Sequence, residues 1–391
     1  MKVFYILFFL LLFILVGLYA PLSQTFYDLR HINNHVIEKQ DSLNTIQNNK
    51  YPQENHIQHH NRESLYIALL SDLHSGTFYL NTILKNLQDA YNAGKLDLIL
   101  MSGDMIDDKE DIEGAREFFK RLNLTPFDKI PKFYVTGNHE LWSGSVVTYK
   151  NLAREHNTFV LDGAIPSLLI EIKKRILLLA GIDDPYSIKY DENGIFINTQ
   201  YPKDWQDKWS KILLQQFSTL QNLAESSIKI YQDSNLYLSF TWLQDILYKD
   251  SYDTYNIASD DLIYQKFLQQ SYKILLSHRP ESIEIYKQLP FNLIVSGHTH
   301  GGQVRIPFVI NGLYAPNQGI LPKYAGGAYS LVSTHQSLQQ YEKKDSMMYL
   351  PNWQNSFNVE FGKFLVVSRG LSFNWKLPRI YNPPEIVWIE I

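Results

Sequence analysis

The chain has 391 residues, of which 45% are hydrophobic and 19% charged, so it can bury a sizeable core and wholesale disorder is excluded. Its length fits one α/β domain of roughly 250 residues with additions, or two domains, and its formal net charge of −4 argues against a nonspecific nucleic-acid-binding surface. Because the chain has no cysteine, disulfides and thiolate chemistry are impossible, and any metal site must use His, Asp, Glu, Asn or backbone oxygens.

The first 22 residues predict an N-terminal transmembrane anchor. Residues 3–20 are apolar apart from one Gly and two Tyr, and as a helix they would span roughly 27 Å, close to the thickness of a bilayer core. A cleaved signal peptide is the alternative, which the length of the run and Pro21 directly after Ala20 disfavour. Lys2 and the terminal amine precede the span, so the positive-inside bias favours an extracytoplasmic location for the rest of the chain.

Residues 23–63 are polar and rich in Asn, Gln and His, which predicts a stalk or linker. His56, His59 and His60 could capture a metal ion, but three such side chains in a polar segment are more typical of a solvated juxtamembrane stretch.

From residue 64 to the end at residue 391, the pattern predicts one α/β domain. Short apolar runs ending in polar clusters alternate with segments of helical periodicity, which indicates βαβ units. The predicted helices cover residues 80–91, before Gly94, and 112–122, and the predicted strands cover residues 65–70, 98–101, 133–135, 176–180, 274–276 and 293–295.

An insertion rich in Tyr, Gln, Asp and Trp is predicted over residues 186–272. A stripe at helical spacing runs through Trp205, Trp209, Ile212, Leu213, Phe217 and Leu220. We favour a helical insertion packed on the core; the alternative is a lid, or a surface for a lipid-bearing substrate.

The polar clusters at the strand ends carry the chemistry. In an open α/β sheet, ligands bind beyond the carboxyl ends of the strands, so folding is expected to gather these clusters near one rim. Carboxylates, an amide and imidazoles of this kind can hold two divalent ions about 3.5–4 Å apart, which activate a hydroxide and clamp a phosphate. The side chains expected there are Asp72, His74, Asp104, Asn138, His139, His278, His298 and His300.

The order of these clusters resembles the calcineurin-like metallophosphoesterase signature. The series runs Asp72-x-His74, Gly103-Asp104-x-x-Asp107, Gly137-Asn138-His139-Glu140, His278 and Gly297-His298-Thr299-His300. The longer runs at residues 297–307, 366–370 and 384–386 resemble a membrane-anchored bacterial branch that includes phosphodiesterases and a UDP-2,3-diacylglucosamine pyrophosphatase of lipid A synthesis. The resemblance implies a four-layer α/β/β/α sandwich at the bacterial inner (cytoplasmic) membrane.

The resemblance also implies a role for each matching residue. Asp104 would bridge two divalent ions (manganese, iron or zinc), and the hydroxide between the ions would attack phosphorus without a covalent enzyme intermediate. His139 would protonate the leaving oxygen or stabilise its charge, and Asp107 would orient that imidazole. The first ion would be held by Asp72, His74, Asp104 and His300, and the second site would be completed by Asn138, His278 and His298.

Several neighbouring residues have weaker assignments. Glu140 is expected at the surface or as an acceptor behind the ligands. Phosphate contacts and structural roles stay open for Arg279, Arg305 and Arg369, and Asp183 and Asp184 are expected outside the set of ligands.

The expected function is hydrolysis of a phosphoester or pyrophosphate bond, on a lipid-linked nucleotide such as UDP-2,3-diacylglucosamine. That reaction needs a cytoplasmic domain, which conflicts with the charge bias around the anchor. The alternatives are a phosphodiesterase acting on soluble nucleotide or cell-wall substrates, a protein phosphatase, and a non-catalytic scaffold that binds metal or phosphate. No nucleic-acid partner is expected.

Overall fold

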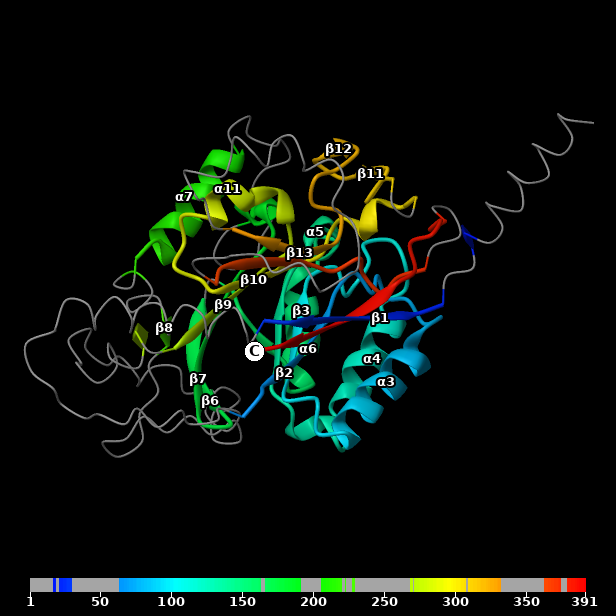
Figure 1. Cartoon of the computed structure of the whole chain (residues 1–391), viewed down its shortest axis with the longest axis horizontal. Helices are drawn as coiled ribbons and strands as arrows, with labels where there is room; N and C mark the ends of the chain where they lie inside the picture. Colours follow the sequence, from blue (N-terminus) through cyan, green and yellow to red (C-terminus); the bar gives the residue numbers. More distant parts are fainter. Residues whose placement is uncertain are drawn as a thin grey trace, which may run out of the picture.

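The computed structural model describes residues 17–18, 21–29, 63–162, 166–190, 205–219, 222, 227–228, 268–269, 271–306, 309–331, 362–373 and 378–391. Two mixed β-sheets form the centre of this part of the chain (Figure 1). The first sheet has six strands, in the order β1 (Ser23–Asp28), β15 (Glu385–Glu390), β2 (Tyr66–Leu70), β3 (Leu98–Ser102), β4 (Lys132–Val135) and β5 (Phe159–Val160).

The second sheet contains the later strands. Its order is β13 (Gly327–Ser330), β14 (Phe364–Val367), β10 (Leu293–Ser296), β9 (Tyr272–Ser277), β7 (Arg175–Ile182), β6 (Ser167–Ile172) and β8 (Ser227–Ile228). Within it β14, β10, β9 and β7 are mutually parallel, as β2, β3, β4 and β5 are in the first sheet. A separate two-stranded hairpin joins β11 (Tyr314–Ala315) to β12 (Gly319–Ile320).

Alternating side chains of the first sheet face two different cores. Ile67 and Leu69 of β2 lie in the core shared with the second sheet, whereas Ala68 and Leu70 lie in a core on the other face, as the two-residue period of a strand requires. Three helices cover that other face: α3 (Leu80–Asn92), α4 (Glu113–Leu122) and α6 (Val146–Glu155) (Figure 1). On the far side of the second sheet, α7 (Trp205–Phe217) and α11 (Ile283–Tyr286) pack against its other face, where their buried side chains join the same connected cluster. The layers therefore follow the order helix, sheet, sheet, helix.

The predicted helices form where the apolar spacing indicated. In α3 the buried side chains recur at Leu80, Ile83, Leu84 and Leu87, which is one face of an amphipathic helix. The chain leaves this helix at Gly94, whose φ of +67° is favourable for glycine. All six predicted strands are present, and the elements beyond the predicted ranges include β1, β15, α5 (Asn138–Trp142) and α6. Short 3₁₀ turns lie at η1 (Phe127–Lys129), η2 (Pro185–Lys189), η4 (Pro280–Ser282) and η5 (His300–Gly302).

The structure departs from the predicted stalk at its N-terminal end. Ser23–Asp28 forms β1 and pairs in parallel with β15, from the C-terminal end of the chain. The strand is at the sheet edge and alternates half-buried and exposed side chains, so its polar composition resembles that of a linker. Residues 30–62, including His56, His59 and His60, lie outside the described residues.

The predicted anchor also lies almost entirely outside the described residues. Among the helices that the structure does describe, none is both long enough and apolar enough to cross a bilayer.

The described part of the insertion packs as a core helix. Trp209, Leu213 and Phe217 of α7 are buried among the hydrophobic side chains that cover the second sheet, and the Trp209 indole N–H donates to the Asp183 carbonyl oxygen at 3.0 Å. The neighbouring Ile212 is exposed. Residues 191–204, 220–221 and most of 223–270 lie outside the described residues.

We expect Trp209→Ala to lower the free energy of unfolding by about 3–5 kcal/mol, because it leaves a cavity in the core. The matched control Ile212→Ala, on the exposed face of the same helix, should change it by less than about 0.5 kcal/mol. Urea unfolding of both variants measures the difference, and equal small effects would favour the lid interpretation for this helix.

Candidate metal centre

The parallel strands bring the predicted site residues to one rim. Asp72 and His74 follow β2, Asp104 follows β3, and Asn138 and His139 open α5 after β4. From the second sheet, His278 follows β9, and His298 and His300 follow β10. Because the carboxyl ends of parallel neighbours share an edge, these loops meet between the two sheets.

The backbone is strained at this rim. Five of the seven predicted metal-binding residues have positive φ, although none is glycine: Asp72 (51°), His74 (49°), Asp104 (52°), His298 (72°) and His300 (49°). Such angles cost energy for residues with a side chain and gather at functional sites. Two glycines allow close approach, since a Cβ at Gly137 would overlap the Asp104 carboxylate and one at Gly297 would overlap Asp72.

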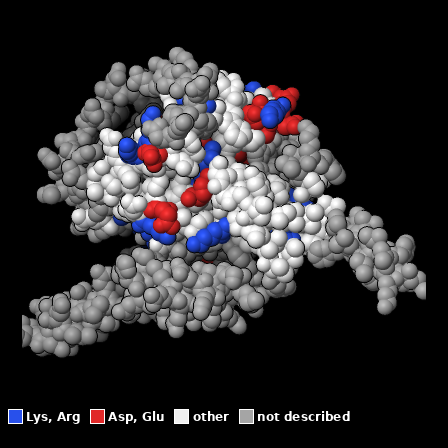
Figure 2. Space-filling view, turned by 90° about the horizontal axis from the view of Figure 1, so that it is seen from above, with Lys and Arg blue, Asp and Glu red and all other residues white. Residues whose placement is uncertain are grey.

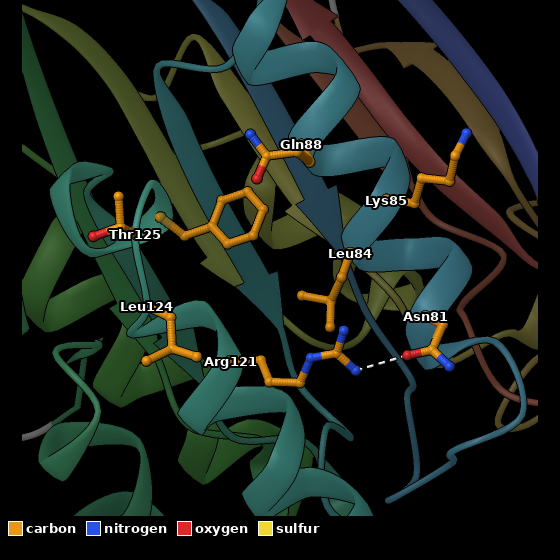
Figure 3. A pocket seen from close by; sticks show the side chains of 8 residues that line it. Asn81, Leu84, Lys85, Gln88, Arg121, Leu124 and Thr125 are labelled. Atoms are coloured by element: carbon orange, nitrogen blue, oxygen red, sulfur yellow. Dashed lines mark hydrogen bonds between the residues drawn. The ribbon is translucent and has the colours of Figure 1, made fainter.

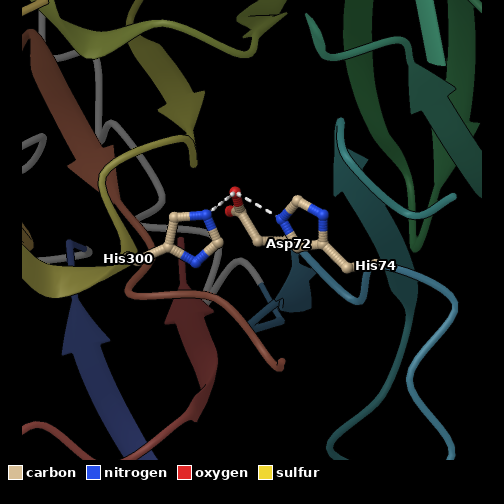
Figure 4. Close-up of side chains that lie close together, drawn as sticks. All are labelled: Asp72, His74 and His300. Atoms are coloured by element: carbon tan, nitrogen blue, oxygen red, sulfur yellow. Dashed lines mark ion pairs between the residues drawn. The ribbon is translucent and has the colours of Figure 1, made fainter. Parts of the chain in front are cut away.

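One group of ligand atoms is formed by Asp72, His74 and His300 (Figure 4). The Asp72 carboxylate lies between the two rings, with its Oδ1 3.9 Å from His74 Nε2 and 3.6 Å from His300 Nε2. These separations are too long for hydrogen bonds. Within the described part of the chain, the buried His74 Nε2 has no hydrogen-bond partner. The three atoms therefore face a common point at which an ion fits.

A second group is formed by Asp104, His278 and His298. His278 Nε2 lies 3.1 Å from Asp104 Oδ2 and 3.2 Å from His298 Nδ1. The other ring nitrogen of His278, Nδ1, lies 2.7 Å from the Ser102 carbonyl oxygen, to which it donates, so that Nε2 faces the site. Asp104 Oδ2 is also 3.8 Å from His74 Nε2, so one carboxylate borders both groups.

Asn138 brings a further ligand atom to the rim. Its Oδ1 is buried and, among the described residues, has no hydrogen-bond partner. A buried amide oxygen without a partner is costly unless something else binds it. The donor set at the rim is thus carboxylate, amide and imidazole, which fits divalent manganese, iron or zinc.

Asp107 contacts two imidazoles. Its Oδ2 lies 2.9 Å from His74 Nδ1 and 3.2 Å from His139 Nδ1. It therefore orients His74 as well as the His139 ring for which it was predicted. The sequence prediction gave no role to Asp108, whose Oδ1 is 2.6 Å from His139 Nδ1. Its position directly after Asp107 was the only feature of the sequence that could have indicated this contact.

The surroundings of the rim histidines shift their pKa values in opposite directions. Burial lowers the pKa of His139, but the paired carboxylate of Asp107 and the charge of Asp104 raise it overall to about 9. The pKa values of His298 and His300 are instead held well below the usual range, mainly by burial. The charge of Arg279 adds to this effect at His298, and that of His74 adds to it at His300. Neutral imidazoles are the form that binds metal. His278 resembles His139: burial lowers its pKa, but Asp104 raises it to about 10, so an ion bound at Nε2 would displace a proton. Despite the burial of Asp104, this imidazolium keeps the pKa of Asp104 well below the ordinary value, so Asp104 is anionic.

Glu140 joins two of the rim loops. It is fully buried, and its carboxylate accepts hydrogen bonds from the backbone N–H groups of Asp104 (3.1 Å), Ile106 (2.9 Å) and Gly137 (2.8 Å). Glu140 thus behaves as an acceptor behind the rim, and the alternative of a surface position is wrong.

The arginines singled out in the sequence are engaged in the fold. Arg279 is buried and pairs with Asp184, with Nη2 3.0 Å from Oδ1, and Arg369 pairs with Glu385 at 2.6 Å. Arg305 donates to Asn311. Asp183 accepts from Thr136 and pairs with Lys150, so Asp183 and Asp184 are placed apart from the two ligand groups, as expected.

Two rim contacts had no signal in the sequence. Asn317, in the turn between β11 and β12, has its Nδ2 3.2 Å from His298 Nε2. Arg379 has its Nη2 3.4 Å from His300 Nδ1. Both come from the C-terminal third of the chain, where spacing alone does not place a loop.

A hollow of about 310 Å³ elsewhere is unrelated to the rim (Figure 3). It lies between α3 and the end of α4, where Arg121 donates to Asn81 at 2.7 Å. None of its lining residues belongs to the two ligand groups.

The described fold and rim agree with the comparisons to known proteins. Residues 65–302, more than half of the chain, match the calcineurin-like phosphoesterase family. The metallophosphoesterase YkuE of Bacillus subtilis is 25% identical over 309 residues, which cover 78% of each chain. The UDP-2,3-diacylglucosamine pyrophosphatase LpxG of Chlamydia muridarum is 30% identical over 29% of this chain and 27% of its own length.

A third relative, the phosphodiesterase YaeI of Escherichia coli, is 46% identical over 37 residues, or 10% of this chain and 14% of its own length. The matched part therefore spans only a small share of the two relatives that are named for a reaction. The family match and the rim of carboxylates and imidazoles nevertheless agree on the class of chemistry. This chain belongs to the calcineurin-like phosphoesterase family and is a metal-dependent phosphoesterase.

Proposed function

We propose that this chain hydrolyses a phosphodiester or pyrophosphate bond with two divalent metal ions. The observation that carries the proposal is the single carboxylate of Asp104 bordering two groups of ligand atoms. The first ion would be held by Asp72, His74, Asp104 and His300, and the second by Asp104, Asn138, His278 and His298. When bound, a pair of such ions supplies an activated hydroxide and neutralises charge on the phosphate.

The chain's own residues fix the ligands before substrate arrives. The Ser102 carbonyl oxygen holds the Nδ1 proton of His278, and Asp107 holds that of His74. In each ring Nε2 is then directed at the site, where it would bind an ion once deprotonated. This arrangement reduces the reorganisation that metal binding and phosphate binding would otherwise require.

His139 is proposed to deliver the proton to the leaving oxygen. With a pKa of about 9 its imidazole is protonated at neutral pH, and its ring lies 4.4 Å from that of His74, measured between centroids. It is therefore placed at the edge of the first ligand group with a proton to give.

We expect His139→Ala to lower kcat by about 10²–10⁴-fold on a diester with an alkyl leaving group, and by much less on a nitrophenyl diester. An alkoxide needs a proton in order to leave, whereas nitrophenolate does not. Steady-state kinetics on the two substrates measure the ratio. His156→Ala, at the end of α6, is the control and should leave both rates unchanged. Equal losses on both substrates would instead assign His139 to charge stabilisation.

The substrate that we propose is a lipid-linked nucleotide such as UDP-2,3-diacylglucosamine. The partial match to LpxG and the apolar run at residues 3–20 support this proposal. A groove of about 160 Å³ also supports it, because it is lined by Phe78, Tyr79 and Phe373 and by Leu73, the residue before His74 in the sequence. Phe78 is exposed and stacks on Phe373 with the ring centroids 5.0 Å apart. Soluble nucleotides or cell-wall phosphodiesters are the alternative substrates.

The domain arrangement and location complete the proposal. Residues 1–22 would anchor the chain in the bacterial inner membrane, residues beyond β1 would form the linker, and the insertion at about 186–272 would belong to the catalytic domain. Hydrolysis of UDP-2,3-diacylglucosamine requires that domain to face the cytoplasm. A reporter fused to the C-terminus reads the side directly: an extracytoplasmic reporter would exclude this substrate and favour a cell-wall phosphodiester.

A further inference from the structure

Exposed apolar side chains gather on one segment of the described chain. Of the twelve large hydrophobic side chains that the described residues expose, five lie within residues 309–321. A concentration of this kind marks an interaction surface, whereas single exposed apolar residues do not. We call residues 313–321, which contain β11 and β12, the apolar hairpin. Its exposed side chains are Leu313, Tyr314, Ile320 and Leu321, with exposed fractions from 43% to 75%.

The backbone holds these side chains outward. Leu321 has a φ of +54°, which is unfavourable for a leucine, and its N–H donates to the Leu313 carbonyl oxygen at 2.8 Å. The Leu313 N–H in turn donates to the carbonyl oxygens of Gly302 and Val304. The apolar hairpin is therefore fastened to the loop that carries His298 and His300. A strained leucine kept in solvent indicates a use for its side chain.

The segment that carries the apolar hairpin has basic residues and no acidic ones, and the one carboxylate among the described residues that contacts its turn, Glu281 beside Asn317, is paired with Arg279. From residue 301 to residue 331 the chain has no Asp or Glu, and its charged residues are Arg305 and Lys323. Figure 2 views the molecule from the end at which β11 and β12 lie, and there the charged side chains form separate groups with uncharged surface between them. Apolar side chains beside basic ones are the composition that binds the headgroup region of anionic lipid.

The apolar hairpin lies on the same side of the fold as the end of the N-terminal apolar run. Gly17, near the end of that run, accepts a hydrogen bond from the Tyr381 N–H at 2.8 Å. The adjacent Ile380 bridges to Val304, which is the residue that holds Leu313. Two steps of backbone pairing thus connect the end of the run to the apolar hairpin.

We propose that the apolar hairpin docks onto the surface of a bilayer containing anionic lipid, with Ile320 and Leu321 in its interface. Asn317, at the turn of the apolar hairpin, contacts His298, so docking would hold the metal rim at the level of the lipid headgroups. The proposal uses the membrane anchor of the proposed function for its orientation. It does not depend on the catalytic roles, because depth in the bilayer is measured without turnover.

Because the chain has no cysteine, single-cysteine variants of the full chain each report on one position. Ile320→Cys and Leu321→Cys would carry a nitroxide label in vesicles of phosphatidylethanolamine and phosphatidylglycerol. Leu124→Cys, exposed after α4, is the matched control. We expect collisions with oxygen to exceed those with a water-soluble nickel complex at positions 320 and 321, and the reverse at position 124.

Labels at 320 and 321 that are as accessible to nickel as the label at 124 would overturn the proposal. Labels shielded from both reagents would overturn it too, because they would indicate a protein partner. Two further measurements separate the two proposals. Unchanged label depth in an Asp104→Asn background that has lost hydrolysis leaves docking intact, and normal hydrolysis by Ile320→Cys and Leu321→Cys whose labels stay in water leaves the catalytic proposal intact.

Discussion

Replacing Asp104 by Asn is expected to reduce phosphodiester hydrolysis by about a thousand-fold or more, equivalent to roughly 4 kcal/mol of transition-state stabilisation. The carboxylate is the one group that borders both sets of ligand atoms, at 3.1 Å from His278 and 3.8 Å from His74. An amide has the same shape but lacks the negative charge that the two proposed cations would require. Its oxygen can still accept from the His139 backbone N–H, as Asp104 Oδ1 does at 2.9 Å.

The measurement is kcat/KM on a chromogenic phosphodiester with manganese present, beside a circular dichroism spectrum that reports the fold. Asp89→Asn is the matched control, because Asp89 is exposed on α3 and pairs only with Lys85 among the contacts described. Near-normal turnover by folded Asp104→Asn would contradict the bridging role.

Replacing Glu140 by Ala is expected to lower the free energy of unfolding by about 3 kcal/mol or more. Three backbone N–H donors would lose their acceptor, and each unsatisfied buried donor costs about 1–3 kcal/mol. Two of them belong to the loop that carries Asp104, so hydrolysis should fall even where the variant remains folded. Urea unfolding and kcat on the same preparation measure both effects.

Two further variants sharpen this test. Glu140→Gln keeps one acceptor oxygen and should lie between the wild type and Glu140→Ala in stability. Glu284→Ala removes an exposed glutamate of α11 and should change stability by less than about 0.5 kcal/mol. If Glu140→Ala and Glu284→Ala had the same free energy of unfolding, the hydrogen bonds from the two loops to Glu140 would not stabilise the fold.

The central strands could be predicted because they are buried on both faces. Runs such as residues 98–101 and 293–295 are continuously apolar, which is the pattern of a parallel strand inside a layered fold. Once these strands are placed, the residues that follow them must meet at one rim, so Asp72, Asp104 and His298 were found from order and spacing. The edge strand β1 was missed because half of its side chains face solvent and its partner β15 is more than 350 residues away.

The sequence predicted which residues lie at the rim better than it predicted which contacts they make. Asp107 was expected beside His139 and also contacts His74, because the two rings lie edge to face. Asn317 and Arg379 reach the rim from loops whose position depends on pairings across the whole chain. Such contacts are set by tertiary structure and leave no local pattern in the sequence.

Elemental analysis of the purified full chain tests the central claim most directly. The arrangement of ligand groups predicts two divalent ions per chain, at least one of which is lost in Asp104→Asn, with hydrolysis abolished by a chelator and restored by manganese. A chain that held no metal and still hydrolysed the diester in excess chelator would contradict the account.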